Sequence, residues 1–253
     1  MTKDEILLAR QEYLFPAVFH YYDEPLVISR ARDQFVYDSD GNEYLDFFGG
    51  IVTISVGHCN QEVNAKVHAQ LDTLQHVSTV FSTEPLVALA KRVAEVTPER
   101  KLTKSFFTNS GTEANEVAIL AARCYTGHNE IIALRHSYHG RSALGMALTG
   151  QAAWRIGDAS SGGVVHAHNA YCYRCPFGQK YPECGIRCAT DVKELIETTT
   201  SGRVSGFISE PIQGVGGFIT PPPEYFAIVT GIVREHGGIL ISDEVQTAWG
   251  RTG

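Results

Sequence analysis

A Ser-Gly-Thr turn at residues 110–112 connects the apolar run 105–108 to a segment with helical spacing. One face of this helix is predicted to carry Ala114, Val117, Ala118 and Ala121. A strand that passes directly into a helix presents backbone N–H groups and the positive end of the helix dipole, and hydroxyl groups in the turn add donors. The turn is therefore a candidate phosphate site. Serine and threonine also favour the N-cap of any helix, so both interpretations stay open.

Residues 137–141, Ser-Tyr-His-Gly-Arg, follow a second apolar run at 131–134. Tyr138 can stack on a planar ligand, and the guanidinium of Arg141 can pair with a carboxylate through two hydrogen bonds. This segment therefore indicates an aromatic ligand and an acidic substrate. By itself it equally describes a surface loop with an exposed aromatic side chain and an ordinary arginine.

Acids end two further apolar runs. Glu210 follows residues 206–209, and Asp243 follows residues 239–242. Burying a carboxylate at the end of an apolar strand costs free energy unless a cation lies beside it, and a protonated pyridine nitrogen is such a cation. Asp243 is thus a candidate partner for a cationic aromatic ring, with helix capping or a salt bridge as the alternative.

These apolar runs, with one more at 164–167, alternate with helical segments along the chain. Strands that alternate with helices predict an α/β fold with a mainly parallel sheet flanked by helices, whose ligands lie at the carboxyl ends of the strands. Nearer the N-terminus, residues 35–37 and 44–47 flank a polar turn and predict a β-hairpin. Two helices are predicted in between from apolar residues at helical spacing: Val63, Val67, Leu71 and Leu74, then Leu86, Leu89, Ala90 and Val93.

The order and wording of these motifs resemble the class III, fold-type I pyridoxal-phosphate-dependent aminotransferases, and most closely their alanine–glyoxylate and phospholyase-like branch. The matching stretches are SGTEAN at 110–115, YHGR at 138–141, EPIQG at 210–214 and GGILISDEVQTAWGRTG at 237–253. The hairpin sequence DSDGNEYLDFFGG at 38–50 matches as well. Most relatives have Gly-Phe where Ala248 and Trp249 stand here, a difference that affects the wall of the pocket.

The resemblance implies that pyridoxal 5'-phosphate is the cofactor, and it assigns the contacts of that cofactor. Three residues hold the phosphate: Ser110, Gly111 and Thr112. Tyr138 and Val245 pack on the two faces of the pyridine ring. Asp243, the catalytic residue of this chain, pairs with the ring nitrogen, and Gln246 reaches the phenolic oxygen.

The same resemblance implies the substrate contacts and the activity. Glu210 is assigned to the cofactor-binding residues, near the active-site arginine or the substrate amine, and Arg141 binds a substrate carboxylate. The implied reaction is a ping-pong transamination between an amino acid or ω-amino acid and a 2-oxo acid, carried out by a homodimer. A lyase acting on a phosphorylated amino alcohol, a decarboxylase and an aminomutase share the scaffold and stay open. Because no lysine follows Lys193, we expect the cofactor-binding lysine beyond residue 253 and interpret the chain as an inactive fragment of a longer protein.

Residues 1–55 are expected to contribute to the small domain of such an enzyme, and residues 56–253 to form the first part of its cofactor-binding large domain. The large domain contains a cysteine-rich insertion at about 171–188. Its cysteines form a C-x2-C pair and a C-x3-C pair separated by eight residues: Cys172, Cys175, Cys184 and Cys188. Four thiolates can bind zinc, but this gap is shorter than in most zinc ribbons, so ordinary reduced thiols stay open and no metal ligand is assigned.

Composition narrows the choice of partners. The formal net charge is −7, and no basic segment clusters along the chain, which argues against nucleic-acid binding. No apolar run has the length of a bilayer span and the first residues lack a signal-peptide pattern, so we expect a cytoplasmic protein without membrane association. The glycine-rich residues 214–217 suggest a nucleotide-binding module, but neither a GxGxxG motif after a first strand nor a P-loop supports it.

Overall fold

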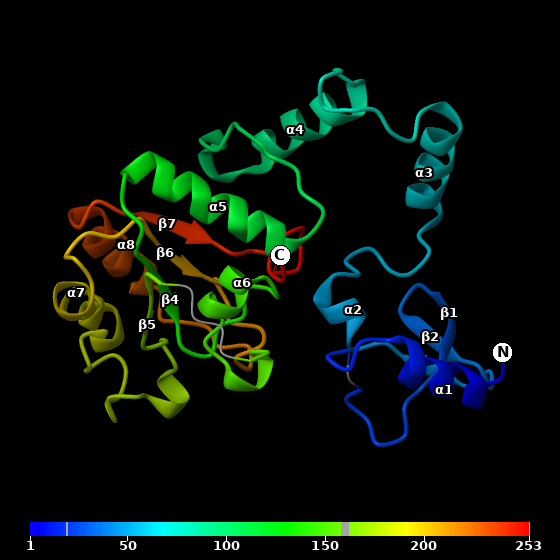
Figure 1. Cartoon of the computed structure of the whole chain (residues 1–253), viewed down its shortest axis with the longest axis horizontal. Coiled ribbons are helices and arrows are strands. Elements are labelled where there is room, and N and C mark those ends of the chain that lie inside the picture. Colours follow the sequence, from blue (N-terminus) through cyan, green and yellow to red (C-terminus); the bar gives the residue numbers. More distant parts are fainter. Residues whose placement is uncertain (19, 158–161, 253) are drawn as a thin grey trace. The chain divides into compact units, whose positions relative to one another are not determined.

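A computed structural model describes residues 1–18, 20–157 and 162–252. The chain forms two compact units, Met1–Phe107 and Thr108–Gly253, which we describe separately (Figure 1). Contacts thus group residues 56–107 with the N-terminal segment, whereas the boundary predicted from the resemblance lies between residues 55 and 56. That functional boundary stays a prediction.

The first unit contains the predicted hairpin within a small antiparallel sheet of order β1-β2-β3. The carboxylate of Asp38 shapes its turn, because it accepts hydrogen bonds from the Asp40 and Asn42 backbone N–H groups, the Asn42 amide and the Tyr44 hydroxyl. The strands are β1 (Ile28–Arg32), β2 (Phe35–Asp38) and β3 (Glu43–Leu45), and the helices are α1 (Lys3–Tyr13), α2 (Gly49–Val52), α3 (Gln61–Thr73), α4 (Glu84–Val96) and the 3-10 turn η1 (Pro98–Arg100).

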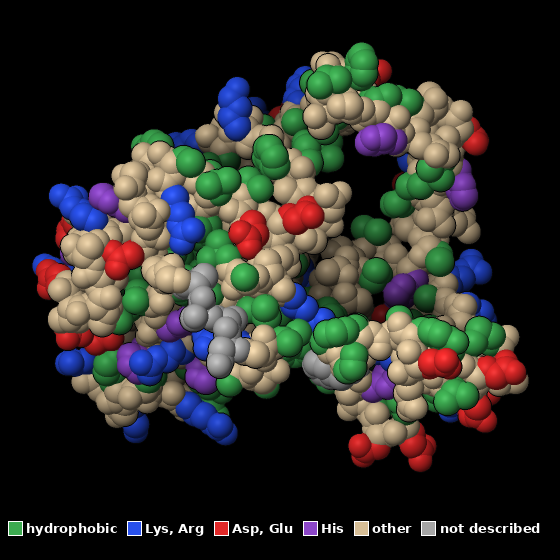
Figure 2. All heavy atoms as spheres, in the orientation of Figure 1, with side chains coloured by type: hydrophobic (Ala, Val, Ile, Leu, Met, Phe, Trp, Pro, Cys, Tyr) green, Lys and Arg blue, Asp and Glu red, His purple; other side chains and the backbone are tan. Residues whose placement is uncertain are grey.

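Helices α3 and α4 confirm the two helices predicted between the hairpin and the phosphate turn. Asn60 caps α3, since its side chain accepts hydrogen bonds from the Glu62 and Val63 N–H groups, and a proline in the first turn of α4 suits a helix start. Neither helix contains a buried residue. Their apolar side chains lie at the surface of this unit, as Figure 2 shows.

The second unit is built on a four-stranded parallel sheet of order β5-β4-β6-β7. The strands occupy the four predicted apolar runs: β4 (Ile131–Leu134), β5 (Val164–Ala167), β6 (Gly206–Ser209) and β7 (Ile239–Ser242). The connecting segments are α5 (Gly111–Thr126), α6 (Ala143–Leu148), η2 (Ala152–Trp154), η3 (Cys172–Arg174), α7 (Arg187–Thr199) and α8 (Tyr225–Glu235). The predicted parallel sheet flanked by helices is confirmed.

Side chains alternate across this sheet, so each face has its own core. Ile132 and Leu134 pack with Phe207 in a core that includes the buried side chains of α7 and α8. Ile131 and Ile208 pack in the other core, which includes residues of α5 and α6. Alternation along the buried strands is the expected consequence of the β-pleat. This packing fixes the sheet edge at which the polar residues of the site emerge.

Two details of the expected fold are wrong. Residues 105–108 form no strand and pair with no strand among the described residues, and Phe106 is 76% exposed. An apolar run becomes a strand only beside a hydrogen-bonding partner. Helix α5 buries Asn115, Ile119 and Ala122, whereas Ala114 and Ala121 of the predicted face are exposed. None of the described helices has the length and apolar character of a membrane span.

Candidate active site

The predicted site residues of the second unit follow the carboxyl ends of β4, β6 and β7, and α5 begins among them. Because parallel strands end at the same edge of a sheet, residues far apart in sequence meet there. Gly111 lies against Val245, Thr112 against Gly140, and Gly214 against Gln246. The structure therefore brings together the phosphate turn, the Tyr138–Arg141 segment and the residues around Glu210 and Asp243.

Asp243 is the most constrained of these residues. Its side chain is buried, and its Oδ2 accepts hydrogen bonds from the Asn115 amide at 2.8 Å and from His139 Nδ1 at 2.8 Å. The Val245 backbone N–H reaches Oδ1 at 3.2 Å. Burial alone would raise the pKa of Asp243, but the hydrogen bond and charge of His139 and the bond from Asn115 outweigh it and lower that pKa. Asp243 is thus held as a carboxylate in a dry environment.

Sequence reasoning missed the roles of Asn115 and His139. The Asn115 amide also donates to the His139 backbone oxygen at 3.1 Å, so one side chain links α5, the loop after β4 and the acid after β7. His139 is 1% exposed, and its backbone N–H donates to Thr149 Oγ1 at 3.0 Å. A polar residue on the buried side of α5 and a histidine beside Tyr138 were the available signals.

The start of α5 combines a helix cap with the features of an anion site. Ser110 Oγ accepts the Glu113 N–H at 3.2 Å, which confirms the N-cap interpretation. The hydroxyl hydrogen stays available to a ligand, because a hydroxyl donates and accepts at once. The N–H groups of Gly111 and Thr112 point along the helix axis without intrahelical acceptors. A methyl group at Gly111 would lie 2.6 Å from Val245 Cγ2, so this turn has no room for a side chain there.

Glu210 positions two backbone segments of the site. Its Oε2 accepts the Tyr138 N–H at 3.2 Å, and its Oε1 accepts the Gly214 N–H at 3.1 Å. Burial raises the pKa of Glu210 above its usual value, although the charge of His139 and the two backbone hydrogen bonds act in the opposite direction. Glu210 therefore lies next to Tyr138, and its carboxylate faces the backbone of the site.

The remaining predicted residues surround Asp243 with different exposures. Val245 is 54% exposed, although the buried Asp243 lies only two residues before it. The Tyr138 ring is half-buried and meets Trp154 edge-on, with ring centroids 5.6 Å apart. The Gln246 amide fills the space beside Gly214. The Arg141 side chain is exposed, and its backbone N–H lies 3.4 Å from Thr112 Oγ1, which places the Arg141 backbone beside the phosphate turn.

Comparison with known proteins shows to which family the chain belongs. The family model described as aminotransferase class-III matches residues 19–253. The chain belongs to the class III aminotransferases. Among its relatives, alanine–glyoxylate aminotransferase 2 homolog 2 of Arabidopsis thaliana, a mitochondrial protein, is 40% identical over 252 residues, which are 100% of this chain and 52% of that protein. A leucine/methionine racemase of Thermococcus litoralis is 34% identical over 259 residues, which are 100% of this chain and 57% of that protein.

Solved transaminase structures have the same fold. An (S)-enantioselective ω-transaminase of Thermomicrobium roseum matches with a TM-score of 0.89 and 32% identity, over 100% of this chain and 59% of that chain. A PLP-bound amine transaminase of an uncultivated Pseudomonas species matches with a TM-score of 0.86 and 27% identity, over 94% of this chain and 56% of that chain. The chain thus spans a little more than half the length of these relatives.

Proposed function

We propose that this protein is a pyridoxal-phosphate-dependent transaminase that moves an amino group between an amino acid or ω-amino acid and a 2-oxo acid by a ping-pong mechanism. The observation that carries the proposal is the buried Asp243 carboxylate, which two side chains and one backbone N–H hold in its charged form. Cationic partners stabilise a buried anion; His139 meets one oxygen of this carboxylate, and a protonated pyridine nitrogen would be a second partner.

The residues present fit this cofactor in three places. Asp243 suits the ring nitrogen, and the start of α5 offers backbone N–H groups and hydroxyl groups to a phosphate. Val245 presents an exposed apolar side chain beside Asp243, as packing on a ring face requires. The close contact between Gly111 and Val245 joins the phosphate turn to this ring contact. Family membership supports the assignment, and one solved relative is described as PLP-bound.

In this proposal, the residues of the chain bind and orient the cofactor and hold one proton. The Asp243 carboxylate keeps a proton at the ring nitrogen, and Asn115 and His139 keep that carboxylate charged and aligned. When bound, the cofactor supplies an electron sink for the negative charge that forms on the substrate carbon. Glu210 accepts a hydrogen bond from the Tyr138 backbone, and Arg141 N–H lies against Thr112. The proposed roles are that the Tyr138 ring covers the cofactor and that Arg141 pairs with a substrate carboxylate.

Names of relatives guide the choice of substrates. The Arabidopsis thaliana relative is named for alanine and glyoxylate, so L-alanine is the first amino donor to test and glyoxylate the first acceptor. One relative is named as a racemase, so racemisation of the donor amino acid should be measured beside transamination. We further propose that the protein acts as a homodimer, an inference from the family, and that it acts in the cytoplasm.

The test uses the protein expressed from its complete gene and loaded with pyridoxal phosphate. L-Alanine alone should change the visible absorbance of the bound cofactor and release one equivalent of pyruvate, and glycine should form only after glyoxylate is added. That order of products is the signature of a ping-pong transaminase. Phosphate release from a phosphorylated amino alcohol without pyruvate formation would instead establish the lyase. Failure to bind pyridoxal phosphate would refute the cofactor assignment itself.

A further inference from the structure

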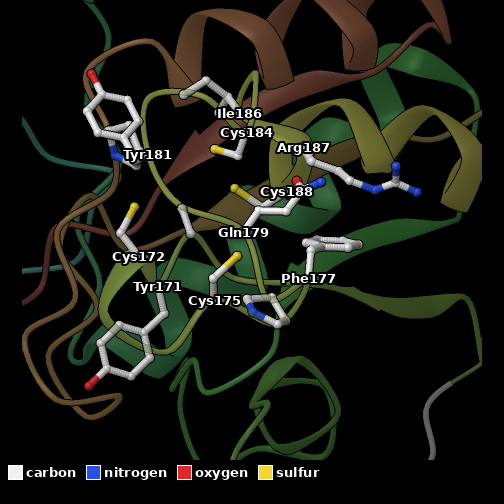
Figure 3. A pocket seen from close by; sticks show the side chains of 13 residues that line it. Tyr171, Cys172, Cys175, Phe177, Gln179, Tyr181, Cys184, Ile186, Arg187 and Cys188 are labelled. Carbon is white, nitrogen blue, oxygen red and sulfur yellow. The ribbon is translucent and has the colours of Figure 1, made fainter.

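The four cysteines of the insertion line one pocket of the second unit. Cys172 lies in η3, Cys175 and Cys184 lie in the turns that follow, and Cys188 lies in the first turn of α7. All four line the same pocket, together with Phe177 and other residues of the insertion, as Figure 3 shows. Residues separated by as many as sixteen positions therefore meet around one small volume.

The insertion holds these cysteines on a folded framework. The Gly178 N–H donates to the Cys175 oxygen at 3.0 Å, and the Cys184 N–H donates to the Lys180 oxygen at 2.9 Å. The Arg187 guanidinium lies over the Phe177 ring, 5.4 Å from its centroid, which attaches the loop to the start of α7. The thiols thus belong to a defined structure in which two turns and one helix present them to a common space.

The four thiols line one small volume, and all of them are free. Cys175, Cys184 and Cys188 are partly buried, whereas Cys172 is exposed. Four thiolates can share this pocket only if a cation compensates their repulsion.

A buried hydroxyl group lies in the core against which Cys188 packs. The Tyr225 side chain is 0% exposed, and its hydroxyl has no hydrogen-bond partner within the part of the chain that the structure describes. A buried donor without an acceptor is costly.

We propose that the four-cysteine pocket binds one Zn²⁺ ion through the thiolates of Cys172, Cys175, Cys184 and Cys188. Zinc with four thiolates is a closed tetrahedral site whose usual role is structural. In the described part of the chain, no group of three or more Cys, His, Asp or Glu side chains is arranged so that it could hold a metal ion. The thiols must therefore turn inward about their single side-chain torsions when the ion enters, and each gives its proton to solvent.

The proposed ion would clamp the insertion between β5 and α7. Cys172 and Cys175 follow β5, and Cys188 belongs to α7, so four bonds to one ion tie both ends of the loop together. Zinc should consequently raise the thermal stability of the protein and protect residues 171–188 from proteolysis. This site is separate from the cofactor residues, so its test does not depend on transaminase activity.

The experiment is zinc analysis of the protein expressed from its complete gene and purified without chelators. We expect about one zinc per chain, with proton release on titration of the metal-free protein with Zn²⁺. Co²⁺ in place of zinc should give the intense sulfur-to-metal absorption of a tetrahedral thiolate site. The double variant C184S/C188S should lose the metal, whereas Cys124→Ser, at an exposed cysteine of α5, should keep it.

Several outcomes would overturn the proposal. Wild-type protein that takes up neither Zn²⁺ nor Co²⁺ while a thiol reagent titrates all six cysteines would leave the pocket as ordinary thiols. Iron with inorganic sulfide would identify a cluster instead, and disulfides found by mass spectrometry in protein purified under reducing conditions would identify a covalent clamp. The cobalt spectrum is measured on wild-type protein, so the proposal can be refuted even if the double variant fails to fold.

Discussion

At the level of single residues, the carboxylate of Asp243 decides whether the proposed chemistry is possible. Asp243→Asn keeps the shape of the side chain and removes its charge, so the ring nitrogen loses the anion that holds its proton. We expect kcat to fall on the order of 10²–10³-fold, as when one preorganised polar group is removed from an active site. Steady-state transamination measures this change. The matched control is Glu244→Gln, the exposed neighbouring acid, which should retain the wild-type rate.

His139 sets the pH range over which Asp243 stays charged. The pKa of Asp243 is lowered mainly by its hydrogen bond and charge interaction with His139, so His139→Leu should raise that pKa. A carboxylate with a lowered pKa contributes binding energy at higher pH and loses it as the pH falls through its pKa. Cofactor affinity should therefore weaken at a higher pH in His139→Leu than in the wild type.

A fluorescence or absorbance titration of pyridoxal phosphate at several pH values tests this expectation. His139→Asn, which keeps an amide donor near the position of Nδ1, is the matched variant and should restore part of the acid tolerance. If all three proteins lose affinity at the same pH, His139 has only a packing role.

At the level of elements, the loop after β4 must pass very close to the start of α5. Gly140 has a φ of 125°, and a methyl group there would lie 2.6 Å from Thr112 Oγ1. Gly140→Ala therefore combines backbone strain with a steric clash and should lower the free energy of unfolding by about 1–3 kcal/mol. Denaturant unfolding measures this loss.

Gly231→Ala in α8 is the matched control for Gly140→Ala. Nothing lies within 4 Å of the added methyl group, and the position is inside a helix. Alanine should there stabilise the protein by roughly 0.5–1 kcal/mol, because it loses less conformational entropy than glycine. Equal effects of the two substitutions would contradict the close approach of the loop to α5.

At the level of the whole molecule, one ligand should order segments that are far apart in sequence. Pyridoxal phosphate is expected to slow amide hydrogen exchange together at residues 110–115, 137–141, 210–214 and 243–247, because these segments meet at one sheet edge. Inorganic phosphate should protect only the first of them. Exchange measured by mass spectrometry distinguishes the two patterns, and protection confined to a single segment under pyridoxal phosphate would contradict a shared site.

The sequence was sufficient to predict elements whose signals are local. The four buried strands were predicted with the bounds that the structure shows, because apolar runs between turn residues mark such strands directly. The run at 105–108 has the same appearance but forms no strand, because a strand also depends on its neighbours in space. The buried face of α5 was misplaced for a related reason, since the polar Asn115 lies inward to meet Asp243.

The candidate site was predictable only as far as single motifs carry chemistry. Asp243 and the Ser110–Thr112 turn are recognisable because their residue types and positions at element ends are unusual. The contacts that bring these residues together with Asn115 and His139 depend on the strand order β5-β4-β6-β7, which no local pattern specifies. Sequence separation of 104 and 128 residues between these hydrogen-bonded partners explains why they were missed.

The hydrogen bond between Asn115 and Asp243 can form only late in the synthesis of this chain on the ribosome. Its partners are 128 residues apart, so at about 5–20 residues per second the acid is made roughly 6–25 s after the amide. During that interval α5, β4 and β6 exist while Asn115 has no carboxylate to receive its hydrogen bond. A nascent chain cannot offer a complete ring-nitrogen contact before Asp243 leaves the exit tunnel. Cofactor capture through this contact is consequently a late event, and the colour of the bound cofactor would report chains in which translation has passed this point.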